Sequence, residues 1–293
     1  MLPAGIGTAT TWQVFMKDQA AFASKLRWWR ERRGLSQLEL SGRAGMSQRH
    51  LSFLELARAS PSRRMVLRLA EALGVPLRQH NALLLSAGFA PAWRETELGA
   101  PELGQIERAI DYMLTQQEPF PAVAVDRRWT LLKANRAANC LVEFLVGPLA
   151  PGVEVNLADA LVGPGVLRPY LTNWADVVRY FIRSVEADAA ADGSEETAAL
   201  LERLLAYKGV RSALHSPMPE PAQGPVLPMY FRKGRTTLAL FTTIATLGTP
   251  RDVTAQELRI ESFFPLDDAT AAVLRGWAKV AKAKAARRSR LAR

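Results

Sequence analysis

The sequence predicts two domains of different class: an all-α domain of five helices, then an α+β domain with an antiparallel sheet. The 293 residues exceed the length of one typical domain. Through residues 21–92, apolar positions recur at helical spacing and are interrupted by Gly and Pro. Beyond residue 118, short runs rich in Val, Thr and aromatic residues, bounded by turn residues, predict strands.

These patterns and the composition of the chain ends place the boundaries. We predict a flexible N-terminus at 1–20, the helical domain at 21–92, a linker at 93–104, the α+β domain at 105–280 and a basic tail at 281–293.

The five helices follow from their buried faces and their caps. The first is expected over Trp12–Arg33 and buries Phe22, Leu26 and Trp29. Ser36, Ser47 and Ser62 are suitable N-caps for the next three helices, because a serine hydroxyl accepts from the free N–H groups of a first turn. Gly74 ends the fourth helix, and Pro76 starts a fifth that runs to Leu85.

The second domain begins with an amphipathic helix and a hairpin, and Asn135 is expected to cap the helix that follows them. The region 141–215 is rich in helices, and within it Ala187–Ser194 is expected to form a flexible acidic loop. The expected elements around it are a helix over Leu103–Gln117, strands over Pro119–Asp126, Trp129–Ala134, Met229–Arg232, Thr236–Leu247 and Glu257–Phe264, and a last helix over Ala269–Ala285.

The charge is divided unevenly along the chain. Residues 1–97 contain 14 Lys and Arg against 7 Asp and Glu, and residues 98–274 contain 16 against 21. Residues 275–293 contain 8 against none. A polyanionic partner for the two ends is the natural inference. The basic tail could contact nucleic acid or simply form a solvated face.

A tight turn between two short helices is the strongest motif. Gly45 can take a left-handed turn conformation at low cost, and Ser41 and Ala44 allow two helices to approach closely. The stretch Leu35–Glu55, LSQLELSGRAGMSQRHLSFLE, resembles the helix-turn-helix of lambda-repressor-like regulators of the xenobiotic-response-element type. Leu56–Pro61 departs from the more polar turn of many relatives, which affects only the exit from the second helix.

This resemblance implies that double-stranded DNA is the partner of the first domain. Gln48 is the first candidate for base recognition, because a carboxamide can bind adenine through two hydrogen bonds. In the family that this stretch resembles, the residue at the position of Gln37 contacts phosphate and braces the glutamine of the recognition helix. Arg49 could bind guanine or phosphate, and an arginine of the first helix, such as Arg27, is a candidate for phosphate contact. The other candidate DNA-binding residues are Ser47, His50 and Ser52.

A second resemblance covers the C-terminal half. The hairpin before Asn135 resembles the opening of a PAS-like sensor domain, and the block Leu238–Thr270 is similar to the ligand-binding domain of MmyB-like transcription regulators. The resemblance implies a ligand-responsive regulator, with a fatty-acid-like or other apolar small molecule as ligand.

Aromatic and aliphatic residues of this domain could enclose such a ligand, although core packing is the better explanation for any single one of them. An arginine at the edge, Arg127, Arg232 or Arg235, could lie near a polar head group. The candidate ligand-binding residues are Val123, Val125, Trp129, Phe144, Trp174, Val178, Phe181, Tyr230, Leu240 and Phe263.

Other function classes find little support. No Cys and His spacing predicts a metal site, no nucleophile motif predicts catalysis, and no residue indicates a haem or flavin. The absence of a long apolar run argues against a membrane span, and the lone Cys140 suits a reducing cytoplasm. A homodimer is expected, because one recognition helix reads few base pairs. A domain that serves only dimerisation, or one that holds a cofactor or an enzymatic site, remains an alternative for the second half.

Overall fold

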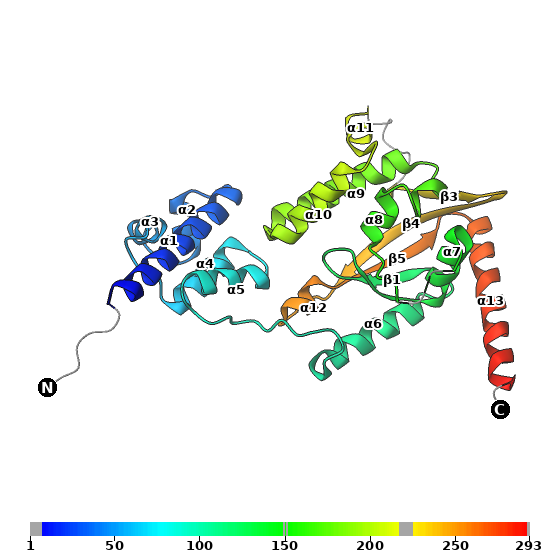
Figure 1. The fold of residues 1–293 in the computed structure, drawn as a ribbon, viewed down its shortest axis with the longest axis horizontal. Helices are drawn as coiled ribbons and strands as arrows, with labels where there is room; N and C mark the ends of the chain where they lie inside the picture. Colours follow the sequence, from blue (N-terminus) through cyan, green and yellow to red (C-terminus); the bar gives the residue numbers. More distant parts are fainter. Residues whose placement is uncertain (1–7, 149, 151, 217–224, 292–293) are drawn as a thin grey trace. The chain divides into compact units, whose positions relative to one another are not determined.

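The computed structural model describes residues 8–148, 150, 152–216 and 225–291, and the chain in these ranges divides into two compact units (Figure 1). The main boundary between the units follows Glu95. The first unit is helical and the second combines helices with one antiparallel sheet. The fold class predicted from the sequence is therefore confirmed.

Within residues 8–95, five helices surround one apolar core. Phe22, Leu26 and Trp29 of the first helix are each at most 2% exposed and pack against leucines of the other four. The helices are α1 (Thr8–Arg32), α2 (Gln37–Arg43), α3 (Gln48–Glu55), α4 (Arg63–Leu73) and α5 (Leu77–Ser86).

The predicted caps are present. Ser36 and Glu39 form a reciprocal capping box at the start of α2, and Ser47 and Ser62 accept from the backbone at the starts of α3 and α4. Gly45, between α2 and α3, has φ +61°, a conformation that side chains with a Cβ rarely adopt. The serine caps and the glycine that predicted the helix-turn-helix motif are therefore the residues that form its turn and its helix ends.

The start of α1 differs from the prediction. The helix begins at Thr8, four residues before the predicted start at Trp12, and it includes residues 8–20 of the segment that we assigned to the flexible N-terminus. The sequence from Thr8 to Arg33 contains no Gly or Pro, and its Ala, Met, Gln and Lys residues favour a helix. Residues 1–7 lie outside the described ranges.

The second unit is built on a sheet with the strand order β2-β1-β5-β4-β3, in which every neighbouring pair is antiparallel. Val123 pairs with Glu261 on the next strand, and Glu261 pairs with Ile244 on the strand after it. The strands are β1 (Ala122–Val125), β2 (Leu131–Ala134), β3 (Met229–Lys233), β4 (Thr236–Thr246) and β5 (Arg259–Pro265).

Helices cover both faces of this sheet. On one face, α6 packs Ile110 and Leu114 against Ala122, Ala124 and residues of β5. On the other, α7 to α11 enclose the core around Val123, Trp129 and Phe181 (Figure 1). The helices are α6 (Gly104–Gln116), α7 (Arg136–Val146), α8 (Leu157–Val162), α9 (Trp174–Asp192), α10 (Glu195–Ala206), α11 (Val210–His215), α12 (Val253–Glu257) and α13 (Asp268–Leu291), with short 3-10 turns at Pro101–Leu103 and Arg168–Tyr170.

Asn135 is the polar centre of this arrangement. Its side-chain oxygen caps α7 by accepting from Ala138 N at 2.8 Å and also accepts from Ala122 N at 3.1 Å. Its amide donates to the carbonyls of Phe120 and of Leu114, at the end of α6. The residue is buried, and one side chain therefore joins α6, β1 and α7.

Two other helices are longer than predicted. Residues 187–192, assigned to a flexible loop, continue α9, because this stretch is mostly alanine and Gly193, with φ +58°, is the first residue that breaks the helix. The last helix, α13, runs to Leu291, into the predicted basic tail. Most of the expected loop at Pro217–Pro228 lies outside the described ranges.

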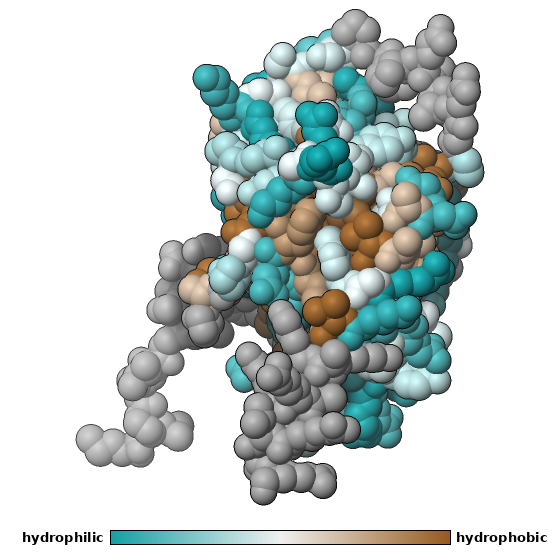
Figure 2. Space-filling view, turned by 90° about the vertical axis from the view of Figure 1, so that its right-hand side faces the viewer, coloured by the Kyte–Doolittle hydropathy of each residue, from teal (hydrophilic) through white to brown (hydrophobic). Residues whose placement is uncertain are grey.

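The surface of the second unit carries apolar side chains. Figure 2 shows a face on which they gather at the centre, between hydrophilic neighbours. Large apolar residues of this unit that are more than a third exposed include Tyr230, Ile244, Leu266 and Val280. In the described part of the chain, no helix is long and apolar enough to span a membrane.

Candidate functional site

The exposed side of α3 carries the candidate base-contacting residues. Gln48 and Arg49 are exposed in the first turn, while Leu51 and Leu54 are fully buried and fix the opposite side in the core. Ser47 caps the helix by accepting from His50 N at 3.2 Å. Gln48 and Arg49 therefore lie at one exposed helix end, as recognition in a major groove requires.

Neighbouring side chains restrict Arg49 and His50. The guanidinium of Arg49 lies 5.4 Å from the ring centre of Phe53 on the next turn, and both side chains remain at the surface. His50 is half-buried, with Nε2 3.1 Å from the sulfur of Met65. Ser52 is also half-buried. The face open to a partner in this structure is therefore formed mainly by Gln48 and Arg49.

Gln37 takes part in a buried network that the sequence did not predict. Its amide donates to Glu55 Oε2 at 2.9 Å, and not to the glutamine of the recognition helix. Arg30 donates to both oxygens of Glu55, at 2.6 and 2.9 Å, and to the carbonyl of Leu35. The hydrogen bond to Glu55 raises the pKa of Arg30 above its usual value. The network joins α1, α2 and the end of α3.

Several arginines have structural contacts. Arg33 donates to the carbonyls of Leu73 and Gly74 at the end of α4, and Arg27 forms an exposed pair with Glu31. Arg68 of α4 donates to the carbonyl of Gly45 at 2.9 Å, which holds the turn before α3. The sequence did not single out Arg68. Other basic side chains of this unit are exposed: Arg43, Arg58, Arg63 and Arg64.

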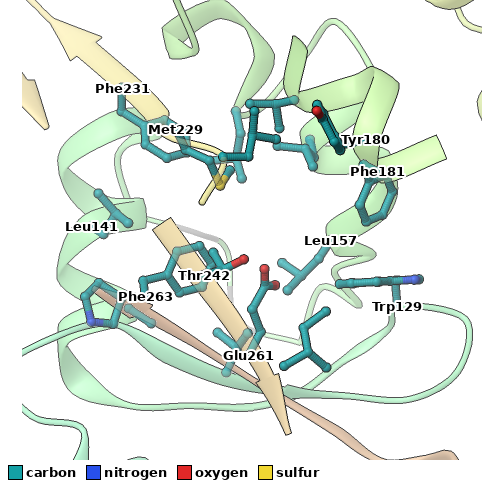
Figure 3. Close-up of a pocket in the computed structure, with 18 of the residues that line it drawn as sticks. Trp129, Leu141, Leu157, Tyr180, Phe181, Met229, Phe231, Thr242, Glu261 and Phe263 are labelled. Atoms are coloured by element: carbon teal, nitrogen blue, oxygen red, sulfur yellow. The ribbon is translucent and has the colours of Figure 1, made fainter. Parts of the chain in front are cut away.

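The second unit contains a cavity of about 310 Å³ between the sheet and α7, α8 and α9. Its wall is mainly aliphatic and aromatic (Figure 3). Tyr180, Ser184 and Ile244 line it and are exposed, so the opening lies between α9 and β4. Such an apolar pocket with a few polar groups is typical of a small-molecule site.

Four of the predicted ligand-binding residues line this cavity: Val123, Trp129, Phe181 and Phe263. The other six do not. Val125, Val178 and Leu240 are fully buried core residues, and Tyr230 points to the surface because its neighbours Met229 and Phe231 take the inward positions of β3. Phe144 packs against Trp277, and Trp174 donates to the carbonyl of Leu161 at 3.1 Å.

The predicted arginines are also absent from the described wall. Arg127 pairs with Glu196 and Glu257, and Arg232 and Arg235 lie exposed at the β3–β4 turn. The charged residue that the structure places in the wall is Glu261 of β5.

The carboxylate of Glu261 points into the cavity beside the hydroxyl of Thr242 (Figure 3). Burial among apolar groups raises its pKa to about 7, and a hydrogen bond with Thr242 opposes this shift. The sequence contained a signal for this residue, because Phe263, which was predicted, and Glu261 are two apart on one strand and share a face.

A second cavity, of about 850 Å³, is lined by α7, α8 and the segments next to them. It shares Val123, Ala138, Val142, Leu157 and Leu167 with the first and adds polar residues such as Asn139 and Asp159. Among the residues described, no group of three or more His, Cys, Asp or Glu side chains is placed to hold a metal ion.

Comparison with protein families assigns both units. Residues 26–79 match a helix-turn-helix family, and residues 106–276 match the ligand-binding domain of MmyB-like transcription regulators. The second match covers more than half of the chain. The chain belongs to the MmyB-like transcription regulators.

This MmyB-like regulator therefore combines a helix-turn-helix head that binds DNA with a ligand-binding domain. The match confirms both predicted resemblances, and it confirms that the protein is a regulator and not an enzyme. The structure adds where the exposed candidate residues of α3 and the apolar cavity lie.

Comparison with curated proteins gives no match. Among solved structures, that of an RNA-binding light-oxygen-voltage receptor is similar, with 13% identity and a TM-score of 0.27 over 96% of this chain and 69% of that chain. A similarity of this level supports no inference about the function of the MmyB-like regulator.

Proposed function

We propose that an elongated, apolar, fatty-acid-like molecule enters the cavity between the sheet and α9 and controls DNA binding by the head. The observation that carries the proposal is the 310 Å³ apolar cavity in a domain joined to a helix-turn-helix unit. The protein works in the cytoplasm, where its DNA partner is found.

The strands of the cavity wall provide a route for the signal. Val123 of β1 and Glu261 of β5 line the cavity, while Ala122 and Ala124 of β1 and Ile260 of β5 pack against α6 on the other face. The helix α6 directly follows the linker from the head. A ligand that displaces β1 or β5 therefore acts on the helix to which the head is attached.

Asn135 strengthens this route. It binds the end of α6, the start of β1 and the start of α7, and α7 contributes Ala138, Leu141 and Val142 to the cavity wall. A shift of α7 on ligand binding is transmitted to α6 through one buried side chain.

On the DNA side, Gln48 and Arg49 read bases from the first turn of α3, and Ser47, His50 and Ser52 support them. Gln37 holds the end of α3 through its hydrogen bond to Glu55. Gln48 is exposed and close to the N-terminal end of α3, where a bidentate contact with adenine is feasible. A homodimer would place two such helices on a two-fold operator. The exposed apolar side chains of the second unit are candidates for its interface.

The test begins with mass spectrometry of a solvent extract of the purified protein, together with a native mass spectrum. A stoichiometric lipid-like molecule is expected, and the native spectrum should show a dimer. DNA binding is then measured with and without this molecule.

Cavity-filling variants provide the control. Val142→Trp and Leu157→Trp should abolish the response of DNA binding to ligand, whereas Leu98→Trp, at an exposed position, should leave it unchanged. Thermal unfolding shows that each variant is folded. An empty wild-type protein that takes up no member of a lipid panel would instead favour a domain used only for dimerisation.

A further inference from the structure

The polar part of the cavity wall is built around one acid. Glu261 pairs with Val123 of β1 and Ile244 of β4, and all three residues line the cavity. Figure 3 shows the oxygen atoms of Glu261 and Thr242 together in the space enclosed by Trp129 and Phe181. The acid is therefore placed where a ligand would be.

The described wall offers this acid no cation. Strands β1, β3 and β4 and helices α7 and α8 contribute no other charged side chain, and α9 contributes the hydroxyls of Tyr180 and Ser184. Arg259, two residues along β5, is held by Asp188 of α9 at 2.6 Å, with its guanidinium 5.7 Å from the ring centre of Trp129. This nearby positive charge is matched by a carboxylate of its own.

An ionised carboxylate in apolar surroundings is unfavourable unless a positive charge accompanies it. Burial raises the pKa of Glu261 to about 7, so the cavity wall contains an acid that ionises near neutral pH. A fatty-acid carboxylate at this position would add a second negative charge, and one of the two acids would have to bind a proton. A protonated amine would supply the missing charge and donate hydrogen bonds.

We infer that the cavity selects amphiphiles with a protonated amine head group over fatty acids of the same length, with Glu261 as the counter-ion. The inference rests on the proposed function and specifies its ligand. The apolar wall accommodates the hydrocarbon body, and the carboxyl determines the charge of the head.

Three probes of equal chain length test this on the full-length protein: decylamine, decanol and decanoic acid. Binding is followed by calorimetry and by the change in tryptophan fluorescence, to which Trp129 in the wall contributes. At about pH 8, where a carboxyl of this pKa is mostly ionised, the amine should bind at least about tenfold more tightly than the alcohol. The acid should bind more weakly than the alcohol.

Glu261→Gln should remove the preference for the amine and improve binding of the acid. Glu202→Gln, which makes the same change on the exposed side of α10, should leave all three affinities unchanged. The wild-type protein supplies a test without substitution, because its affinity for the amine should rise about tenfold from about pH 6 to about pH 8 as the carboxyl ionises.

The outcomes separate the two proposals. Equal binding of the three probes, tighter binding of the acid at about pH 8, or an unchanged amine affinity in Glu261→Gln would overturn the inference and leave an apolar ligand site in place. Failure of all three probes to bind the wild-type protein would overturn the proposed function and the inference with it.

Discussion

In the head, Glu55 is buried at the end of α3 and accepts hydrogen bonds from two nitrogens of Arg30 and one of Gln37. In the ligand-binding domain, Glu261 is placed among apolar side chains with the hydroxyl of Thr242 beside it. Glu55 is paired within the fold, so its charge holds three helices together. The structure pairs Glu261 with no cation in the described wall, so its charge is available to a molecule from outside. Glu55 therefore stabilises the fold, whereas Glu261 is the acid that we propose for ligand recognition.

Removing the paired acid should have the largest effect. Glu55→Ala removes the carboxylate that accepts two hydrogen bonds from Arg30, whose side chain is only 11% exposed, and leaves it the carbonyl of Leu35 and the more distant Glu31. We expect the free energy of unfolding of the head to fall by about 3–5 kcal/mol, as for other broken buried ion pairs. Urea denaturation followed by circular dichroism measures it. Glu95→Ala, which breaks a more exposed pair with Arg78 outside this network, should cost at most about 1 kcal/mol, and equal losses in the two variants would contradict this reading.

Removing Glu261, which has no cation beside it in the described wall, should instead increase the free energy of unfolding. The folded-state pKa of Glu261, about 7, lies above the usual glutamate value, so the folded protein binds this proton more tightly than the unfolded chain. Its contribution to stability is therefore present at low pH and is lost as pH rises from about 4.5 to about 7. Glu261→Gln should be more stable than wild type by about 2–3 kcal/mol at about pH 8 and nearly equal at about pH 5. Thermal unfolding at the two pH values measures the difference, with Glu202→Gln as the control. A wild-type stability equal to that of Glu261→Gln at both pH values would contradict the shift.

Asn135 is a buried, hydrogen-bonded polar residue of the ligand-binding domain, so its removal should destabilise the fold as the removal of Glu55 does. Asn135→Ala removes the α7 cap and leaves Ala122 N and two carbonyls without their partner, so we expect a loss of about 2 kcal/mol. It should also weaken the response of DNA binding to ligand. Asn156→Ala, which removes the cap of α8, should cost about 1 kcal/mol and leave that response intact. An unchanged response in Asn135→Ala would exclude this residue from the signalling route.

The smallest change in stability is expected on the exposed face of α3. Gln48→Ala should leave folding unchanged but reduce affinity for an operator selected from random DNA by about 1–3 kcal/mol, the usual value of a bidentate base contact. Binding to non-specific DNA should remain the same. Gln116→Ala, at an exposed position on α6, is the matched control. Equal losses on operator and non-specific DNA would assign Gln48 to phosphate contact instead.

The head could be read from its sequence because its signals are local. The helices are determined by the serine caps, by Gly45 and by the spacing of Leu40, Leu51 and Leu54. Each of these signals lies within a few residues of the helix end or the turn that it determines. The pairing of Gln37 with Glu55 could not be read in this way, because it joins residues that are 18 apart in the sequence.

The cavity was only partly predictable, because its wall depends on which face of each strand is turned inward. In the five-residue strand β3, the inward residues are Met229 and Phe231, and the prediction chose Tyr230 between them. A shift of one residue exchanges the two faces of a strand. Glu261 was missed because an acid was not expected among the aromatic residues of the wall, although its spacing from Phe263 was visible.

The network of Arg30, Gln37 and Glu55 has a consequence for regulation. It fixes α1, α2 and the end of α3 to one another, so a signal from the ligand-binding domain would move the head as a unit without reshaping α3. In a dimer, ligand should then change which separation of half-sites along the DNA is favoured, while the base preference within each half-site stays constant. In such a protein the ligand changes the preferred half-site spacing of the operator, while the preferred base sequence stays the same.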